Sequence, residues 1–258
     1  MSHSNIRTLA VSMLAAVATL VSLSVQATTP EHTAVPAAKT WTTASLRTAL
    51  QALPKGNADA GKKVHDTMFC ASCHGTAGVA PTQNWPHLAG QKAAYTAKMM
   101  LDYQDKRRLE GKRAELMHDL AVMMSPQQIS DVAAFYQAQT PPKDDGTPRP
   151  GAVAAARDVP ALTLVRKGDK TRLITPCASC HGVVGQGGKL EASALAGQNP
   201  LYFVRTLLDY QSGVRHNDNT KGMSAFAKKL SRSEIEALAT YYADLPSTQA
   251  APQGMFGR

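Results

Sequence analysis

The stretch Cys70-Ala71-Ser72-Cys73-His74-Gly75 recurs without change as Cys177-Ala178-Ser179-Cys180-His181-Gly182, 107 positions further along the chain. Two cysteines separated by two residues and followed at once by a histidine are the attachment signature of a c-type haem. The thiols add to the haem vinyl groups as thioethers, and the neighbouring histidine becomes the proximal ligand of the iron. The sequence therefore predicts two covalently bound haem c groups. The expected thioether residues are Cys70, Cys73, Cys177 and Cys180, and the expected proximal ligands are His74 and His181.

Three alternative roles for the cysteines explain less of the pattern. A structural disulfide suits an exported protein, but it does not account for the histidine and glycine that follow the second cysteine in both places. A thioredoxin-like redox pair requires a preceding strand in a βαβ setting, and the sequence shows no such pattern. A zinc site would bring two Cys-x-x-Cys units into one small fold, whereas these units lie 107 residues apart.

The similarity between the two halves extends well beyond the cysteines. At the same offset, the matched segments include Leu88–Gln91 with Leu195–Gln198 and Leu101–Gln104 with Leu208–Gln211. Beyond these segments the offset becomes 106, so that Met117 matches Met223. A period that persists in the same order indicates a duplicated domain.

The composition restricts the class of protein. Of the 258 residues, 43% are hydrophobic and 18% charged, as in a folded globular chain. Aromatic residues make up only 5%, which leaves space in the interior for a large apolar cofactor. The formal charge of +9 could suit nucleic acid, but the basic residues are scattered along the chain, so we expect no nucleic-acid partner.

The N-terminus has the form of a secretory signal. Arg7 supplies a short positive region, an apolar run follows from Leu9 to Val25, and small residues flank Gln26 at the expected cleavage site. We therefore expect residues 1–27 to be a signal peptide and the mature protein to lie in the periplasm. An uncleaved membrane anchor is the alternative.

Four prolines between residues 141 and 150 predict a linker between the two copies, because proline fixes φ and removes a hydrogen-bond donor. The expected parts are an N-terminal extension over 28–56, a first haem domain over 57–140, the linker over 141–160, a second haem domain over 161–246 and a flexible tail over 247–258.

Both copies are predicted to be all-α. Ser125 and Ser231 are candidate N-caps, with Gln128 and Glu234 at the N3 position of a capping box. Apolar residues then recur with helical spacing behind each box. The other expected helices cover about 58–69 and 92–106 in the first copy and about 167–174 and 201–211 in the second.

The repeat also selects candidates for the sixth ligand of each iron. The first copy offers many candidates: Met99, Met100, Met117, Met123, Met124, His65, His87 and His118. In the second copy Met223 is the methionine that precedes the tail, and only Met117 matches it by residue type. We therefore predict Met117 and Met223 as axial ligands, each in a loop before the last capped helix; packing filler is the alternative role.

The order of these motifs, present twice, resembles the dihaem cytochrome c4 family over about residues 56–140 and 165–245. The resemblance implies two class I cytochrome c domains with neighbouring haems and His/Met ligation by His74 with Met117 and by His181 with Met223. Single-haem relatives place a proline carbonyl on the proximal imidazole. Pro86 stands at this position in the first copy and Ser193 in the second.

A protein of this kind is an electron carrier rather than an enzyme, because it needs no acid, base or nucleophile. The resemblance implies redox proteins as partners, for example a bc1-type complex, a terminal oxidase or a periplasmic dehydrogenase, with peripheral membrane association also open. No small-molecule substrate is expected. The alternative is an electron-transfer subunit of a periplasmic dehydrogenase or a dihaem peroxidase-like enzyme. The loop before Met117 is unusually basic for that family. Basic side chains around the haem edges would steer acidic partners.

The two haems are expected to differ in potential. If Ser193 gives His181 a weaker hydrogen bond than Pro86 gives His74, the second proximal imidazole is the poorer electron donor. The larger positive charge of the second copy acts in the same direction. The sequence thus predicts that the second haem is reduced first.

Overall fold

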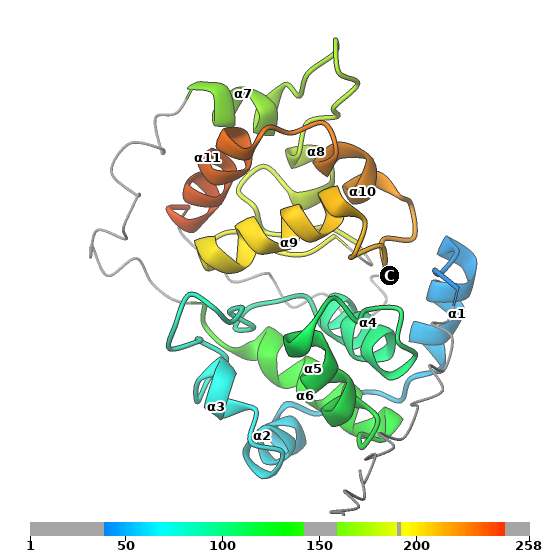
Figure 1. Cartoon of the computed structure of the whole chain (residues 1–258). Helices are drawn as coiled ribbons and strands as arrows, with labels where there is room; N and C mark the ends of the chain where they lie inside the picture. The colour runs from blue at the N-terminus through cyan, green and yellow to red at the C-terminus, as the bar shows by residue number, and fades with distance from the viewer. Residues whose placement is uncertain (1–38, 142–158, 190–191, 246–258) are drawn as a thin grey trace, which may run out of the picture. The chain divides into compact units, whose positions relative to one another are not determined.

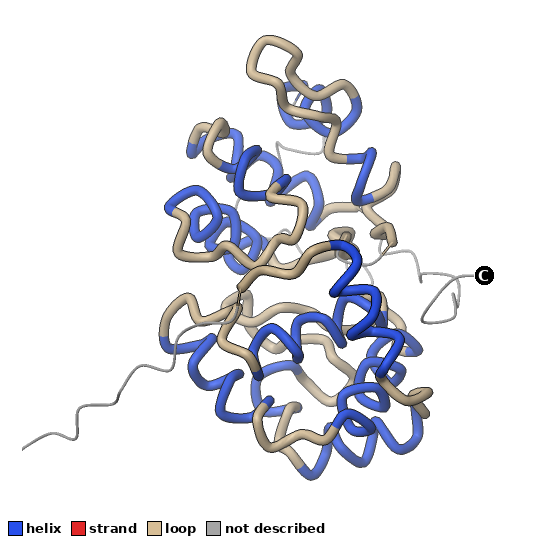
Figure 2. The backbone as a smooth tube through the Cα atoms, turned by 90° about the vertical axis from the view of Figure 1, so that its right-hand side faces the viewer, coloured by secondary structure: helices blue, strands red, loops and turns tan. Residues whose placement is uncertain are grey.

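The computed structural model describes residues 39–141, 159–189 and 192–245. Within these ranges the regular structure is helical, and the sole β-pairing is an isolated bridge between Asp169 and Ile174 (Figure 2). This confirms the all-α prediction. The predicted signal peptide, most of the linker and the predicted tail lie outside the described residues. Among the described residues, no helix is long and apolar enough to cross a membrane.

The helices follow the same order in both copies (Figure 1). A preceding helix α1 covers Thr43–Ala52. The first copy contains α2 (Ala58–Thr67), α3 (Ala71–His74), α4 (Ala93–Gln104), α5 (Lys112–Ala121) and α6 (Pro126–Ala138). The second contains α7 (Val159–Arg166), α8 (Ala178–His181), α9 (Pro200–Ser212), α10 (Gly222–Ala227) and α11 (Arg232–Ala243).

Both predicted capping boxes are present at the last helix of their copy. The Ser125 side chain accepts from the Gln128 backbone N–H, and the Gln128 side chain accepts from the Ser125 N–H in return. Ser231 and Glu234 make the same pair of contacts at α11. These boxes satisfy N–H groups that the first helical turn leaves without partners, which is why both helices begin where the sequence predicts.

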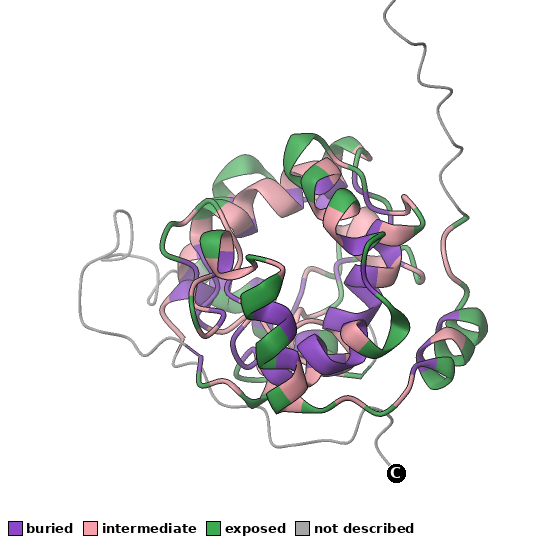
Figure 3. Cartoon of the chain, turned by 90° about the horizontal axis from the view of Figure 1, so that it is seen from below, coloured by how far each residue is buried: buried purple, intermediate pink, exposed green. Residues whose placement is uncertain are grey.

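Each copy has its own hydrophobic core, and buried and exposed positions occupy different faces of its helices (Figure 3). In the first core α2 crosses α6 at a glycine. A Cβ atom on Gly61 would stand 2.0 Å from the carbonyl oxygen of Asp131. Only glycine therefore permits this approach of the two helices.

The helix predicted over 167–174 is wrong. The helix of this region, α7, lies upstream and ends before Gly168, whose φ of +69° reverses the chain. Asp169 then bridges to Ile174, and its carboxylate accepts from the backbone N–H groups of Thr171 and Arg172. These local bonds compete with a helix. Gly61 and Gly168 match in sequence but have different roles. Gly61 permits a close helix crossing, and Gly168 ends a helix.

Part of the predicted N-terminal extension packs on the first copy. The side chains of Leu46 and Leu50 on α1 are fully buried in its core. Trp41, just before α1, donates its indole N–H to an oxygen of Asp102 on α4 at 2.6 Å. The segment over 39–53 is thus an integral part of the first core.

Candidate haem-binding sites

Each Cys-x-x-Cys-His motif forms one turn of helix. Cys70 and Cys177 stand at the N-caps of α3 and α8, and in each case the backbone N–H of the histidine donates to the cysteine carbonyl at 3.0 Å. The four cysteines are free of disulfides. Burial raises the pKa of Cys70 and raises the pKa of Cys177 to about 11, so these two thiols are neutral at physiological pH. The turn places both thiols beside the histidine, as thioether attachment requires.

The two proximal histidine candidates are oriented in the same way. His74 Nδ1 lies 3.1 Å from the Pro86 carbonyl, and His181 Nδ1 lies 2.9 Å from the Ser193 carbonyl. Because a carbonyl only accepts, Nδ1 carries the proton and Nε2 keeps its lone pair free for a metal. Burial lowers the pKa of both residues, that of His74 to about 4, which keeps the rings neutral.

The expected weak bond at His181 is therefore wrong. A backbone carbonyl faces this imidazole, and the serine hydroxyl is not its partner. Proline is not needed at this position because the carbonyl belongs to the backbone, which serine presents equally well. The premise that Ser193 makes the second imidazole a poorer donor has no support.

A cavity of about 330 Å³ brings the predicted axial ligands of both copies together, whereas Cys73, Cys177 and Cys180 do not line it. Its wall includes His74 and Met117 from the first copy and His181 and Met223 from the second. Cys70 also lies on this wall. The cavity thus contains both predicted histidine–methionine pairs, although they belong to segments far apart in the sequence.

The two matched methionines lie on short helices, so their predicted placement in loops is wrong. Met117 is on α5 and Met223 on α10. Gln104 donates to the carbonyls of Ala121 and Met124 just behind Met117. In the second copy Gln211 makes the same two bonds, to Ala227 and Leu230. The donors follow the 107-residue offset and the acceptors the 106-residue offset, so the shift in offset falls between them, which supports the pairing of Met117 with Met223.

Other candidates for the sixth ligand have different surroundings. Met123 is 65% exposed and does not lie on the cavity wall. His65 is fully buried, and its Nδ1 lies 2.8 Å from the Tyr136 hydroxyl. The Nδ1 of His118 lies 2.7 Å from the Tyr103 carbonyl. Met99, Met100, Met124 and His87 do line the cavity.

The basic loop before Met117 does not form a single exposed patch. Arg107 stacks 3.6 Å from the centroid of the Trp41 ring and donates to the Lys39 carbonyl. Arg108 instead turns inward, is 7% exposed, and lies on the cavity wall. Lys112 and Arg113 border the cavity from exposed positions.

The inward-turned arginines test whether the cavity suits a haem. Arg108 and its repeat equivalent Arg215 both line it, and Arg215 Nη1 is buried without a hydrogen-bond partner. A buried, incompletely paired guanidinium favours an anion beside it. A haem presents two carboxylates on an otherwise apolar plane. The histidines, the methionines and these arginines therefore fit haem groups bound inside the cavity.

The sequence did not reveal how the two copies join. Gln91 of the first copy and Gln198 of the second each hold the other copy by its backbone. Gln91 Oε1 accepts from the Ala194 N–H at 2.9 Å, and Gln198 Oε1 accepts from the His87 N–H at 2.9 Å. The sequence shows the repeated Leu-Ala-Gly-Gln segment, but only the structure shows that the glutamine of each copy bonds to the other copy.

Comparison with known proteins supports the same assignment in both copies. Residues 58–139 match the family model for cytochrome c, and residues 168–241 match that for subunit III of cbb3-type cytochrome c oxidase. Cytochrome c4 of Pseudomonas aeruginosa is 34% identical over 189 residues, which cover 72% of this chain and 87% of that protein. The thiosulfate dehydrogenase electron acceptor of Stutzerimonas stutzeri is 30% identical, over 80% of this chain and 94% of its own.

A solved structure extends the similarity to the fold. Reduced recombinant cytochrome c4 from Pseudomonas stutzeri superposes with a TM-score of 0.62 at 30% identity, covering 74% of this chain and 99% of that one. The matches include both Cys-x-x-Cys-His motifs. The chain belongs to the cytochrome c4 family of dihaem electron-transfer proteins and has two cytochrome c domains with two covalently bound haem c groups.

Proposed function

We propose that this protein carries single electrons between redox proteins of the periplasm through two His/Met-ligated haems. The observation that supports this most strongly is the cavity wall, which holds both matched histidine–methionine pairs. The proposed ligands are His74 with Met117 and His181 with Met223, and the proposed thioether residues are Cys70, Cys73, Cys177 and Cys180.

In this function the protein positions the haem ligands and tunes the haem potentials. Bound haem supplies reversible one-electron chemistry at its iron. The Pro86 and Ser193 carbonyls orient the proximal imidazoles, and Gln104 and Gln211 fasten the helices that carry the methionines. Methionine ligation raises the potential of a haem, which suits a late step in electron transfer.

The proposed organisation follows the sequence prediction. Residues 1–27 would direct export and be removed, and the two cytochrome domains would cover 57–140 and 161–246, on either side of a linker over 141–160. A bc1-type complex, a terminal oxidase or a periplasmic dehydrogenase would serve as donor or acceptor, with peripheral membrane association as a further element of the proposal.

A second candidate function is that of an electron-accepting subunit of a periplasmic dehydrogenase. The relative named as a thiosulfate dehydrogenase electron acceptor favours it, because the similarity covers 94% of that protein. A peroxidase-like role is less well supported, since such an enzyme needs one open or displaceable site and both domains keep a methionine on the cavity wall.

The visible spectrum of the oxidised protein tests the proposal. Two low-spin haems with the weak far-red band of methionine-ligated Fe(III) are expected. A high-spin haem would contradict the carrier and support an enzyme with an open iron site. Loss of thiosulfate-dependent reduction on deleting a partner dehydrogenase would identify the accepting-subunit role.

A further inference from the structure

Arg108 and Arg215 occupy the same place in the two domains. They are 107 residues apart, the offset of the haem motifs. The Arg108 guanidinium lies 4.8 Å from the centroid of the Tyr103 ring, and that of Arg215 lies 4.7 Å from that of Tyr210. Both arginines line the cavity. The duplication has thus placed one buried cation in each domain in nearly the same setting.

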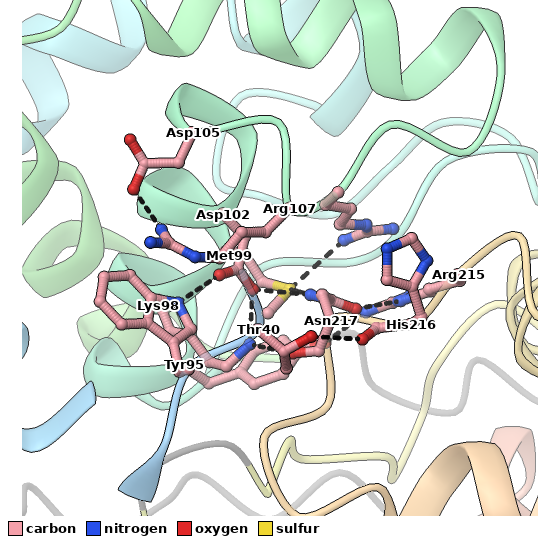
Figure 4. A network of polar contacts seen from close by, with 12 residues as sticks. Thr40, Tyr95, Lys98, Met99, Asp102, Asp105, Arg107, Arg215, His216 and Asn217 are labelled. Carbon is pink, nitrogen blue, oxygen red and sulfur yellow. Dashed lines mark hydrogen bonds and ion pairs between the residues drawn. The ribbon is translucent and has the colours of Figure 1, made fainter. Parts of the chain in front are cut away.

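The partner of the guanidinium differs between the domains. Arg108 Nε donates to Glu110 Oε1 at 2.7 Å, whereas Arg215 Nε donates to Asn217 Oδ1 at 3.0 Å. Glu110 and Asn217 are themselves equivalent at the same offset. Figure 4 shows Arg215 and Asn217 with Met99 and Asp102 among their neighbours. A carboxylate in the first domain is therefore replaced by a neutral amide in the second.

Glu110 is a permanent buried charge. Its side chain is 6% exposed, and it lies on the cavity wall. Burial opposes ionisation, but Arg108 and Arg215 outweigh it and lower the pKa of Glu110 to about 2. The carboxylate is thus negative at any pH at which the protein works. Arg215 has a neutral amide rather than a carboxylate on its Nε.

Two neighbouring charges have charged counterparts in the other domain, whereas Lys112 and Arg113, exposed at the border of the cavity, do not. Asp209, the other acidic residue on the cavity wall, has Asp102 as its sequence equivalent, and Arg205 has Lys98. Asp102 and Lys98 form a buried ion pair with each other away from the cavity wall. The other unmatched carboxylate nearby, Asp218, is absent from the cavity wall and accepts from the N–H and hydroxyl of Ser224 on α10. Glu110 is therefore the acid of the cavity wall whose repeat equivalent, Asn217, carries no charge.

We propose that Glu110 is a tuning residue that separates the two haem potentials, lowering that of the haem attached to Cys70 and Cys73. The loop that carries it leads into α5, seven positions before Met117, and its carboxylate accepts from Arg108 of the same domain. We therefore assign the carboxylate to the surroundings of the first haem. This inference rests on the proposed carrier function. It retains the order predicted from the sequence, with the second haem reduced first, but gives it a different cause.

The physical reason is the charge on the iron. Oxidised haem carries one more positive charge than reduced haem, so a nearby carboxylate stabilises the oxidised form. Two unit charges about 10 Å apart at an effective dielectric constant of about 20 interact strongly enough to change an equilibrium on the order of tenfold. Arg108 and Arg215 stand at equivalent positions, so the proposed difference comes from Glu110 and Asn217.

A redox titration of the haem-loaded, full-length protein tests this inference. Glu110→Gln keeps the size of the side chain and removes its charge, and Asn217→Asp creates the missing acid in the second domain. Glu115→Gln is the matched control, because Glu115 has a more exposed side chain and pairs with exposed Lys112. The wild-type protein is titrated beside the single variants Met117→Ala and Met223→Ala, which assign each reduction wave to a domain.

The expected result is specific to the domain. Glu110→Gln should raise the ratio of reduced to oxidised first haem at a fixed potential on the order of tenfold and narrow the separation of the two waves. Asn217→Asp should lower that ratio for the second haem, and Glu115→Gln should change little. Far-red bands retained in every tuning variant would show that ligation, and with it the proposed function, is intact. Unchanged potentials in both variants, or a shift confined to the second haem in Glu110→Gln, would overturn the inference.

Discussion

Gln91 makes two hydrogen bonds to the backbone of Ala194 across the boundary between the two cytochrome domains. Its Oε1 accepts from the Ala194 N–H at 2.9 Å, and its Nε2 donates to the Ala194 carbonyl at 3.2 Å. Gln198 holds His87 in the same way, with bonds of 2.9 and 3.1 Å. The duplicated chain thus uses one repeated residue type twice, in the self-complementary manner of a two-fold interface.

Removing both glutamine side chains should weaken the junction between the domains. The double variant Gln91→Ala with Gln198→Ala leaves four backbone groups at a buried interface without these partners, at a cost of about 1–3 kcal/mol for each unsatisfied group that stays dry. Urea denaturation should show a lower midpoint. The exposed Gln51 on α1 provides the control, since Gln51→Ala removes the same amide. A midpoint equal to that of the control would show that these bonds do not hold the domains.

The segment before the first haem domain should contribute to stability. Leu46 is fully buried in the first core, so Leu46→Ala should destabilise the protein by about 2–5 kcal/mol through lost burial and a residual cavity. The neighbouring Arg47 is exposed, and Arg47→Ala should have little effect. Thermal unfolding of both variants measures the difference. Equal melting temperatures would mean that α1 is dispensable for the fold.

Covalent attachment of the haems has a direct chemical readout. The colour should remain with the protein after extraction with acidified acetone, and the mass should exceed that of the mature chain by two haems. Replacing Cys70 and Cys73 by alanine should remove one haem and leave the second domain's haem bound, because each motif serves its own domain. Colour that moves into the organic phase from the unaltered protein would contradict thioether attachment.

The sequence predicted well wherever short-range chemistry decides the outcome. The capping boxes at Ser125 and Ser231 specify helix starts through neighbouring residues, and both were predicted correctly. Residues 167–174 were predicted wrongly because Gly168 and Asp169 favour a turn that competes with the helix. Residues that match between the two copies can therefore differ in backbone conformation, as Gly61 and Gly168 do.

Long-range relationships were harder to predict. The inward turn of Arg108, in a loop that is unusually basic in sequence, depends on Glu110 and on the cavity that both residues line. The Ser193 carbonyl was overlooked because the prediction considered the side chain, whereas the backbone makes the bond. In both cases the decisive partner is specified by the fold rather than by the adjacent sequence.

The far-red absorption of the oxidised protein tests the two-haem carrier most directly. Met117→Ala and Met223→Ala should each abolish the band of one haem, lower that haem's potential and leave the other nearly unchanged, and the double variant should lose the band entirely. Met123→Ala is the matched control, because Met123 lies in the same domain but is 65% exposed. The predicted result is that each single variant loses half of the far-red band intensity and that the Met123→Ala control keeps all of it. An unchanged band in Met117→Ala together with a lost band in Met123→Ala or His118→Ala would contradict the ligand assignment in the first domain.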